Sequence, residues 1–472
     1  AKLVHGHVRD LADQGVDRIF MPSVTTVTSE NTSKTSQSMC AVVKGYPIVM
    51  RNSDNPEKRF GIPFDAPLFH WLSQKDRDRQ LTEYLTREFS LDTASVRQAI
   101  DAANAAQKTF KADLAREGER IYDQVEREGS FAVVLASRPY QNDDLVNHEL
   151  PRAFTELGIP VICADAVPHV NEVNLSRSRL DVVNNFHARM LGSAVIAAES
   201  PNLEYVQLVS FGCGHDAYLS DEIIRLMHLA GPKAPLILKV DESDIQGPLR
   251  IRVRSFIETI RLRRKKAGNE KTSDREVAAP PAAGAITPSA VTFAAAATPA
   301  AAPVAAPETF AKTPTTAQAA SAPAPRTRKH SRELPDPYPQ KFTKEDAATK
   351  TVLVPNTSHA FSQLMAAAFA NQGLNTVSLP IGRERAIYLG KRYVHNDICF
   401  PAQIVIGEAL AALESGKYDP DKVAIATGKY IGDCRLTHYA ALLRKALDDA
   451  GYPQVPIITN DAEDAHNVHP GF

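Results

Sequence analysis

A strand–loop–helix–strand layout that occurs twice in the chain places the strongest constraint on the fold. The first copy lies in residues 131–164 and opens with Phe131–Ala136, a continuous apolar run typical of a strand buried on both faces. The second copy lies in residues 351–380 and opens with a similar run. Two strands joined by a helix form a βαβ unit, so each copy predicts a parallel sheet covered by helices.

Further elements extend each copy into a larger lobe. Outside the two copies we expect strands over 17–21, 206–210, 236–240, 423–426 and 455–458, and helices over 218–229, 249–265, 400–414 and 437–450. Residues 75–128 show helical apolar stripes between charged faces, with a break near residue 91, and predict packing helices inserted in the first lobe. The sequence therefore predicts an α/β fold with two related lobes that contain Rossmann-like parallel sheets. We expect the first lobe over residues 1–266 and the second over 341–472, where it is truncated at its C-terminus.

The segment between the lobes has a different composition. Residues 267–340 are rich in Ala, Pro and Thr and show no apolar periodicity. Such a segment cannot bury enough apolar surface to offset its ordering entropy, so we expect a long disordered linker. Its basic cluster, Arg326–His330, has no interleaved aromatic residues, which favours a solvated tether over a nucleic-acid contact.

The overall composition is typical of a soluble globular protein. Of the 472 residues 43% are apolar and 23% charged, and the formal net charge is −1. This balance gives no electrostatic case for a nucleic-acid or membrane partner. The sequence has neither an apolar run of about 18 residues nor a signal peptide at its start, so we expect a cytoplasmic protein.

Four of the five cysteines are candidates for holding a metal or cofactor. Cys213 and Cys434 follow predicted strands, at the carboxyl end where open α/β sheets place their ligands, and Cys40 follows the strand at 17–21 through a longer loop. Cys163 lies inside an apolar strand and is assigned to the core. None of them forms a CxxC pair, so their spacing alone does not distinguish buried thiols from metal ligands.

The fourth candidate, Cys399, belongs to the segment Asp397–Glu408, in which a cysteine precedes a helix that starts with proline. Helix N-termini favour a thiolate and lower its pKa. The helix itself resembles the start of the chain, because Ala402–Glu408 aligns with Ala1–His7 with identical Ala, Val and Gly residues. Because Ala1 is not an initiator Met and no N-cap precedes the first helix, we expect an upstream part to be missing.

Several segments resemble one known family, the acyl-CoA dehydratase activase-related proteins of the 2-hydroxyacyl-CoA dehydratase and double-cubane cluster superfamily. The matching segments are Ala1–Gly6, Cys40–Pro47, Ser137–His148, Ser210–Ala217, Leu238–Glu242, His395–Pro401, Ser415–Lys422, Cys434–Arg435 and Leu442–Leu447. They span both lobes and exclude the linker. The chain departs from the family pattern before Cys434, where Gly428–Asp433 replaces the usual Gly-rich run.

The resemblance implies [4Fe-4S]-type or double-cubane iron–sulfur clusters held by three cysteines each. The first lobe would use Cys40, Cys213 and a cysteine of a Cys-Phe-Pro motif expected before Ala1. The second lobe would use Cys399, Cys434 and a cysteine expected beyond Phe472, so ligation is incomplete in this fragment.

The resemblance also implies partners and a reaction class. An ATP-dependent activase, upstream in the same polypeptide or separate, would supply electrons, and we expect no ATP site in this chain because it has no phosphate-binding glycine loop. The outcome would be dehydration of a 2-hydroxyacyl-CoA or reduction of a small molecule; the alternative is a non-catalytic electron relay or scaffold of a CoA-enzyme activase. We also expect a homodimer.

Three polar residues are candidates for positions beside a cluster. His148 and His215 suit a structural or capping role better than proton donation. Arg138 follows the strand at 131–136 and suits a phosphate or carboxylate ligand as well as a salt bridge.

Overall fold

The computed structural model describes residues 2–33, 36–210, 213–241, 246–266, 334–430, 432 and 434–459. Residues 267–333 of the linker predicted over 267–340 lie outside the described residues. Residues 460–472 of the predicted second lobe lie outside them as well. The two lobes belong to one compact unit. Within the described residues, no helix combines the length and apolar character needed to cross a membrane.

The first lobe contains a four-stranded parallel sheet in the order β6-β5-β7-β8. Its strands are β5 (Ala132–Ala136), β6 (Val161–Cys163), β7 (Leu203–Ser210) and β8 (Leu236–Val240). All five residues of β5 are buried, which confirms the interpretation of this apolar run as a strand covered on both faces. β7 begins earlier than predicted because the residues from Leu203 onward are already buried.

Helices cover both faces of this sheet and make an α/β/α sandwich. Alternate residues of β5 pack against α8 (Asn185–Glu199) and α9 (Gly214–Ala230) on one face, and against α7 (Leu150–Thr155) and α10 (Gln246–Lys266) on the other. The short elements between them are η1 (Pro139–Asn142), α6 (Asp144–Asn147), η2 (Ala164–Ala166) and η3 (Val170–Glu172). The sequence analysis made no prediction for α8.

The second lobe repeats the same topology. Its strands are β9 (Thr351–Val354), β10 (Asn375–Ser378), β11 (Val423–Thr427) and β12 (Ile457–Thr459). They are parallel and follow the order β10-β9-β11-β12, so in each lobe the first strand lies between the second and the third. The helices are α11 (Lys344–Thr349), α12 (His359–Asn371), α13 (Glu384–Tyr393), α14 (Phe400–Glu414), η4 (Pro420–Lys422), η5 (Arg435–His438) and α15 (Tyr439–Asp449). The shared strand order confirms the prediction of two related α/β lobes.

One hydrophobic core joins the lobes. Its buried side chains come from α8 and α9 of the first lobe and from α13, α14 and α15 of the second. Leu334 and Tyr338, which the sequence analysis placed in the linker, are 7% and 4% exposed and belong to this core. The second lobe therefore begins at least seven residues earlier than predicted, because two apolar side chains anchor the segment before residue 341.

The N-terminal residues of the first lobe form a small group of helices and strands outside its four-stranded sheet, called here the small N-terminal arrangement. Its elements are α1 (Lys2–Asp13), β1 (Ile19–Phe20), β2 (Ser23–Thr26), α2 (Ala41–Ser53), α3 (Pro56–Phe60), β3 (Phe64–Asp65) and β4 (Leu68–His70). β1 pairs with β3 and β2 with β4, in two-stranded parallel sheets. The strand predicted at 17–21 is thus present, but it is not part of the open four-stranded sheet.

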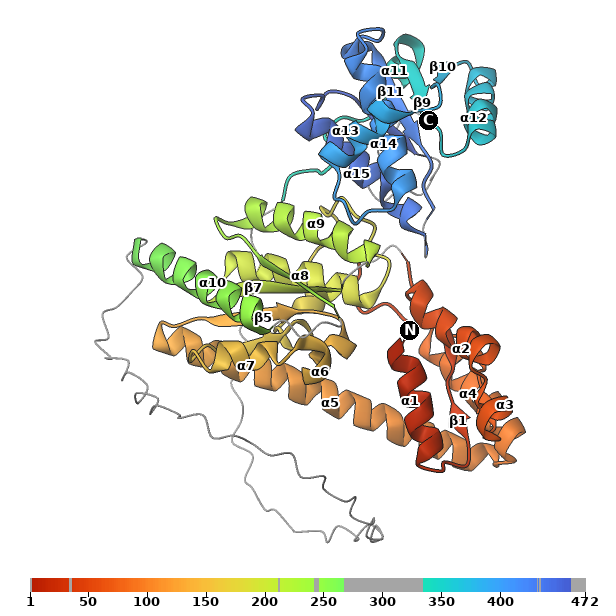
Figure 1. Ribbon diagram of the computed structural model, residues 1–472, viewed down its shortest axis with the longest axis vertical. Helices are drawn as coiled ribbons and strands as arrows, with labels where there is room; N and C mark the ends of the chain where they lie inside the picture. Colours follow the sequence, from red (N-terminus) through yellow and green to blue (C-terminus); the bar gives the residue numbers. More distant parts are fainter. Residues whose placement is uncertain are drawn as a thin grey trace, which may run out of the picture. The chain divides into compact units, whose positions relative to one another are not determined.

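The predicted helical region is confirmed as two helices (Figure 1). They are α4 (Gln74–Phe89) and α5 (Thr93–Glu128). The break between them has a local cause: Ser90 adopts the left-handed conformation that ends α4, and the Asp92 side chain accepts hydrogen bonds from the amides of Ala94 and Ser95 that start α5.

The aligned glycines of α1 and α14 have different surroundings. A methyl group at Gly407 would overlap the backbone carbonyl of Ala386 on α13, whereas nothing lies near the corresponding position of Gly6. The shared sequence pattern thus gives two helices, but only α14 uses its glycine for close helix packing.

This difference predicts opposite effects of the same substitution. Gly407→Ala should lower the free energy of unfolding by about 1–3 kcal/mol through overpacking. Gly6→Ala should raise it by about 0.5–1 kcal/mol, because alanine loses less backbone entropy in a helix. Urea denaturation of both variants measures the two effects, and equal changes in both would contradict this account of the packing.

Candidate functional site

The carboxyl edge of the first sheet brings Arg138 and Cys213 together. The chain leaves β5 and β7 in opposite directions here, and ligands of open α/β sheets bind at such a point. Arg138 follows β5 and Cys213 follows β7, and the Arg138 Nη2 group donates a hydrogen bond to the Cys213 sulfur over 3.4 Å. Burial raises the pKa of the Cys213 thiol, and the Arg138 guanidinium opposes that shift.

A buried ion pair fixes the position of Arg138. Its guanidinium donates to Asp216 Oδ2 over 2.9 Å, and Asp216 is fully buried in the first turn of α9. The backbone amide of Ser210 donates to the same carboxylate over 3.0 Å. Of the two roles that the sequence left open for Arg138, the structure shows the salt bridge.

Cys399 lies at a contact between the two lobes. It precedes α14, and its sulfur is 3.3 Å from the Tyr439 hydroxyl of α15 and 4.0 Å from the Tyr218 hydroxyl of α9. Burial raises the pKa of both phenols, and the neighbouring thiol raises it further. Both hydroxyls therefore stay protonated and are able to donate to the sulfur.

Cys434 lies close to the same contact. It precedes η5, is exposed, and accepts a hydrogen bond from the Leu436 amide at 3.5 Å. Burial and the Cys399 thiol contribute most to the raised pKa of Tyr439, and the Cys434 thiol raises it further. The next residue, Arg435, lies against the backbone of Gly214, where an added methyl group would overlap its guanidinium.

Cys40 lies in the small N-terminal arrangement. It is half-buried and precedes α2. Burial raises the pKa of Tyr46, and the neighbouring Tyr140 and Cys40 add to the shift. The Tyr140 hydroxyl is 3.2 Å from Ser210 Oγ at the end of β7. Tyr46 and Tyr140 therefore lie between Cys40 and the carboxyl edge of the first sheet.

The two candidate histidines occupy different environments. His148 ends α6 in a left-handed conformation, and its Nε2 lies 2.9 Å from the Asp241 carbonyl oxygen, which fits the structural role predicted for it. His215 lies in the first turn of α9, with ring centroids 5.5 Å from His187 and 5.9 Å from His438. His215 is thus half-buried between the two buried imidazoles of His187 and His438.

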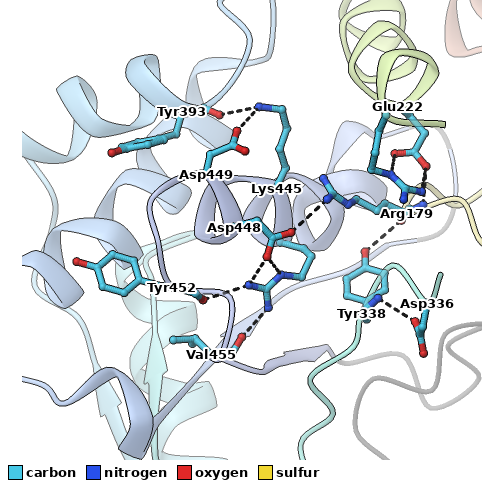
Figure 2. A network of polar contacts seen from close by, with 12 residues as sticks. Arg179, Glu222, Asp336, Tyr338, Tyr393, Lys445, Asp448, Asp449, Tyr452 and Val455 are labelled. Atoms are coloured by element: carbon cyan, nitrogen blue, oxygen red, sulfur yellow. Dashed lines mark hydrogen bonds and ion pairs between the residues drawn. The ribbon is translucent and has the colours of Figure 1, made fainter. Parts of the chain in front are cut away.

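Further polar contacts fix the two lobes against each other (Figure 2). Arg179 of the first lobe pairs with Asp448 of α15 over 3.1 Å, and its backbone carbonyl accepts from the Tyr338 hydroxyl. Asp448 in turn binds Arg444, which is 1% exposed and donates to the Val455 carbonyl over 2.7 Å. A second interlobe ion pair, Lys429–Asp181, is 3.1 Å long with both side chains at most 4% exposed.

Residues 1–167 match the family model described as a CoA enzyme activase uncharacterised domain. The match relates this part of the chain to an activase family, in line with the resemblance inferred from its motifs. This activase-related region contains Cys40 and Arg138 and ends before β7, so it does not reach Cys213, Cys399 or Cys434. The comparisons with curated proteins and with solved structures found no match.

The cysteines have surroundings that suit ligands of an iron–sulfur group, but the described residues do not bring enough ligands together to hold one. Each of the five precedes a helix or 3-10 turn, and Arg138 and Tyr439 supply hydrogen-bond donors to two sulfurs, as thiolate ligands require. Within the part of the chain that the structure describes, no three His, Cys, Asp or Glu side chains are grouped to hold a metal ion. The Cys163 thiol packs against the shared core, as predicted.

Several residues at this site were not predicted from the sequence. They are Tyr218, Tyr439, Arg435, His438, Asp216 and the Lys429–Asp181 pair. Arg435 adjoins Cys434, and Tyr218 lies one turn after Cys213, so proximity to a candidate cysteine was the available signal. The partners themselves come from distant parts of the chain and needed the tertiary structure.

Proposed function

We propose that this protein is an iron–sulfur electron-transfer component that serves a CoA enzyme. In this proposal it accepts electrons from an ATP-dependent activase and supports dehydration of a 2-hydroxyacyl-CoA or reduction of a small molecule. The observation that carries the proposal is the contact of α9 with the surroundings of both second-lobe cysteines, in a chain with an activase-related region. Helix α9, which begins after Cys213, contacts Cys399 through Tyr218 and the neighbour of Cys434 through Gly214.

Four cysteines would supply ligands to iron–sulfur groups: Cys40 and Cys213 in the first lobe, and Cys399 and Cys434 in the second. When bound, such a group supplies one-electron transfer at low potential. Hydrogen bonds to ligand sulfurs are one of the factors that set this potential. Arg138 would donate to Cys213, and Tyr439 and Tyr218 would donate to Cys399.

Exposure distinguishes the two cysteines of the second lobe. Cys399 is half-buried between tyrosines that are 1% and 5% exposed, so these rings exclude water from its sulfur. Cys434 is exposed and accessible to a partner protein. An activase would therefore approach on the Cys434 side, and a homodimer would have to leave that side open.

Anaerobic reconstitution of the full-length protein with iron and sulfide tests the proposal. We expect bound iron and sulfide and an EPR signal on reduction, with iron content reduced several-fold in the Ser variants of Cys213, Cys399 and Cys434. Cys163→Ser is the matched control and should retain full iron content, because its thiol packs in the core. Protein that binds no iron, or that loses it equally in the control, would refute an iron–sulfur role.

A second measurement separates catalysis from relay. The reconstituted protein is supplied with ATP and an activase and assayed for 2-hydroxyacyl-CoA dehydration and for small-molecule reduction. Turnover supports the enzyme component. Reduction of the cluster without turnover would assign the non-catalytic relay instead.

A further inference from the structure

Arg435 and His438 are polar side chains that η5 presents to the start of α9. In a 3-10 helix, residues three apart lie on the same side, so these two project together. Arg435 lies against Gly214, and the His438 ring stands at 88° to the His215 ring and 5.0 Å from the Tyr218 ring. Both side chains of the second lobe thus face the first turns of one helix of the first lobe.

Over the described ranges of the chain, neither side chain has a hydrogen-bonding partner that accounts for its position. Among the described residues, none accepts a hydrogen bond from the Arg435 guanidinium or forms an ion pair with it. His438 is 2% exposed, and its buried Nδ1 atom makes no hydrogen bond. Buried polar atoms are almost always paired, so an unpaired one indicates a missing water, ion or ligand.

The surroundings favour a negative charge. Helix α9 is 17 residues long, and its first amides, those of His215 and Asp216, already counteract the burial that raises the pKa of the Cys213 thiol beside them. Helix N-termini bind anions through such amides and through the helix dipole. The nearby carboxylates of Asp216 and Asp181 are already paired with Arg138 and Lys429, so they do not neutralise Arg435.

We propose that Arg435, His438 and the N-terminus of α9 form a binding site for a small oxyanion, either a carboxylate or a phosphoryl group. The Arg435 guanidinium donates two parallel hydrogen bonds to two oxygens of such a group. His438 donates a third from Nδ1 in one tautomer of the neutral imidazole. The anion then lies between the lobes, beside Cys213 and Cys434. This inference goes beyond the proposed function and requires no iron.

Protection of thiols tests the site in iron-free protein. Alkylation of each cysteine by iodoacetamide is followed by peptide mass spectrometry at increasing inorganic phosphate, with potassium chloride holding the ionic strength constant. A parallel series uses acetate. We expect saturable, several-fold slowing at Cys434 and Cys213 and none at Cys40. Slowing by phosphate alone assigns a phosphoryl ligand, and slowing by acetate assigns a carboxylate ligand.

Variants identify the residue responsible. Arg435→Gln should raise the half-protecting concentration about ten- to a hundredfold, the loss expected for one charge-assisted contact. Arg435→Lys keeps the charge without the planar fork and should have an intermediate effect. Arg254→Gln is the control, because this arginine is exposed on α10 away from the site and should leave protection unchanged.

The outcomes that overturn the proposal are distinct from a folding failure. Thermal unfolding verifies that each variant is folded, and Arg435→Lys supplies a second test if Arg435→Gln is unstable. Slowing that does not saturate, that is equal at Cys40, or that persists in folded Arg435→Gln would show that no anion binds at this place. A failure to bind iron would leave these results unaffected.

Discussion

Replacing Lys429 with Met is expected to lower the free energy of unfolding by about 3–5 kcal/mol, the range for a buried ion pair that loses one partner. The Lys429 ammonium lies 3.1 Å from Asp181, and the two side chains are 3% and 4% exposed. Without Lys429 the Asp181 carboxylate stays buried between the lobes without its cation. Urea denaturation measures the change.

A matched control exists in a second ion pair between the lobes. Lys239 lies 2.5 Å from Asp397, but these side chains are 35% and 28% exposed, so solvent screens the pair. Lys239→Met should therefore cost at most about 1 kcal/mol. The double variant Lys429→Met with Asp181→Leu should recover much of the loss, because no unpaired charge remains. Equal costs for the two lysine substitutions would contradict the importance of burial.

Acidification is expected to destabilise the protein through His438. Burial, together with the neighbouring His215 and Lys429, lowers the pKa of this imidazole from its usual 6.5 to about 3. Between these two pH values the unfolded chain binds a proton at His438 that the folded chain does not. The free energy of unfolding therefore falls as the pH decreases through this window, by at most about 1.4 kcal/mol per pH unit from this residue.

The His438→Phe variant isolates this contribution. Phenylalanine keeps ring contacts with His215 and Tyr218 but does not titrate. As the pH falls from 6.5 to 4, the original protein should lose more unfolding free energy than the variant does. Titration of carboxylates is common to both proteins and cancels in this difference. Parallel pH profiles would show that His438 is not held neutral.

The two sheets could be predicted because the apolar runs of their strands indicate burial. Phe131–Ala136 is apolar at every position, and β5 is buried on both faces. The second copy of the layout then predicted the second lobe, whose strand order proved to be the same. The strand expected at 17–21 instead pairs, over Ile19–Phe20, with Phe64–Asp65, a strand of only two residues that has no sequence signature.

The candidate site was predicted in part. Cys213 and Cys434 follow β7 and β11 as expected, because a parallel sheet places all its carboxyl ends on one edge. The sequence did not indicate that Cys399 would contact Tyr218, since those residues belong to different lobes and meet only through tertiary packing. For the same reason, the polar character of the interlobe contact, with Arg435, His438 and Lys429, was not foreseen.

The core shared by both lobes has a consequence for how the protein is made. A ribosome completes the first lobe before the second exists, and its α8 and α9 then have no α13–α15 layer to pack against. The nascent chain must carry this apolar surface while residues 267–333 and the whole second lobe are synthesised. The apolar faces of α8 and α9 therefore stay uncovered until α13–α15 have been synthesised and can pack against them.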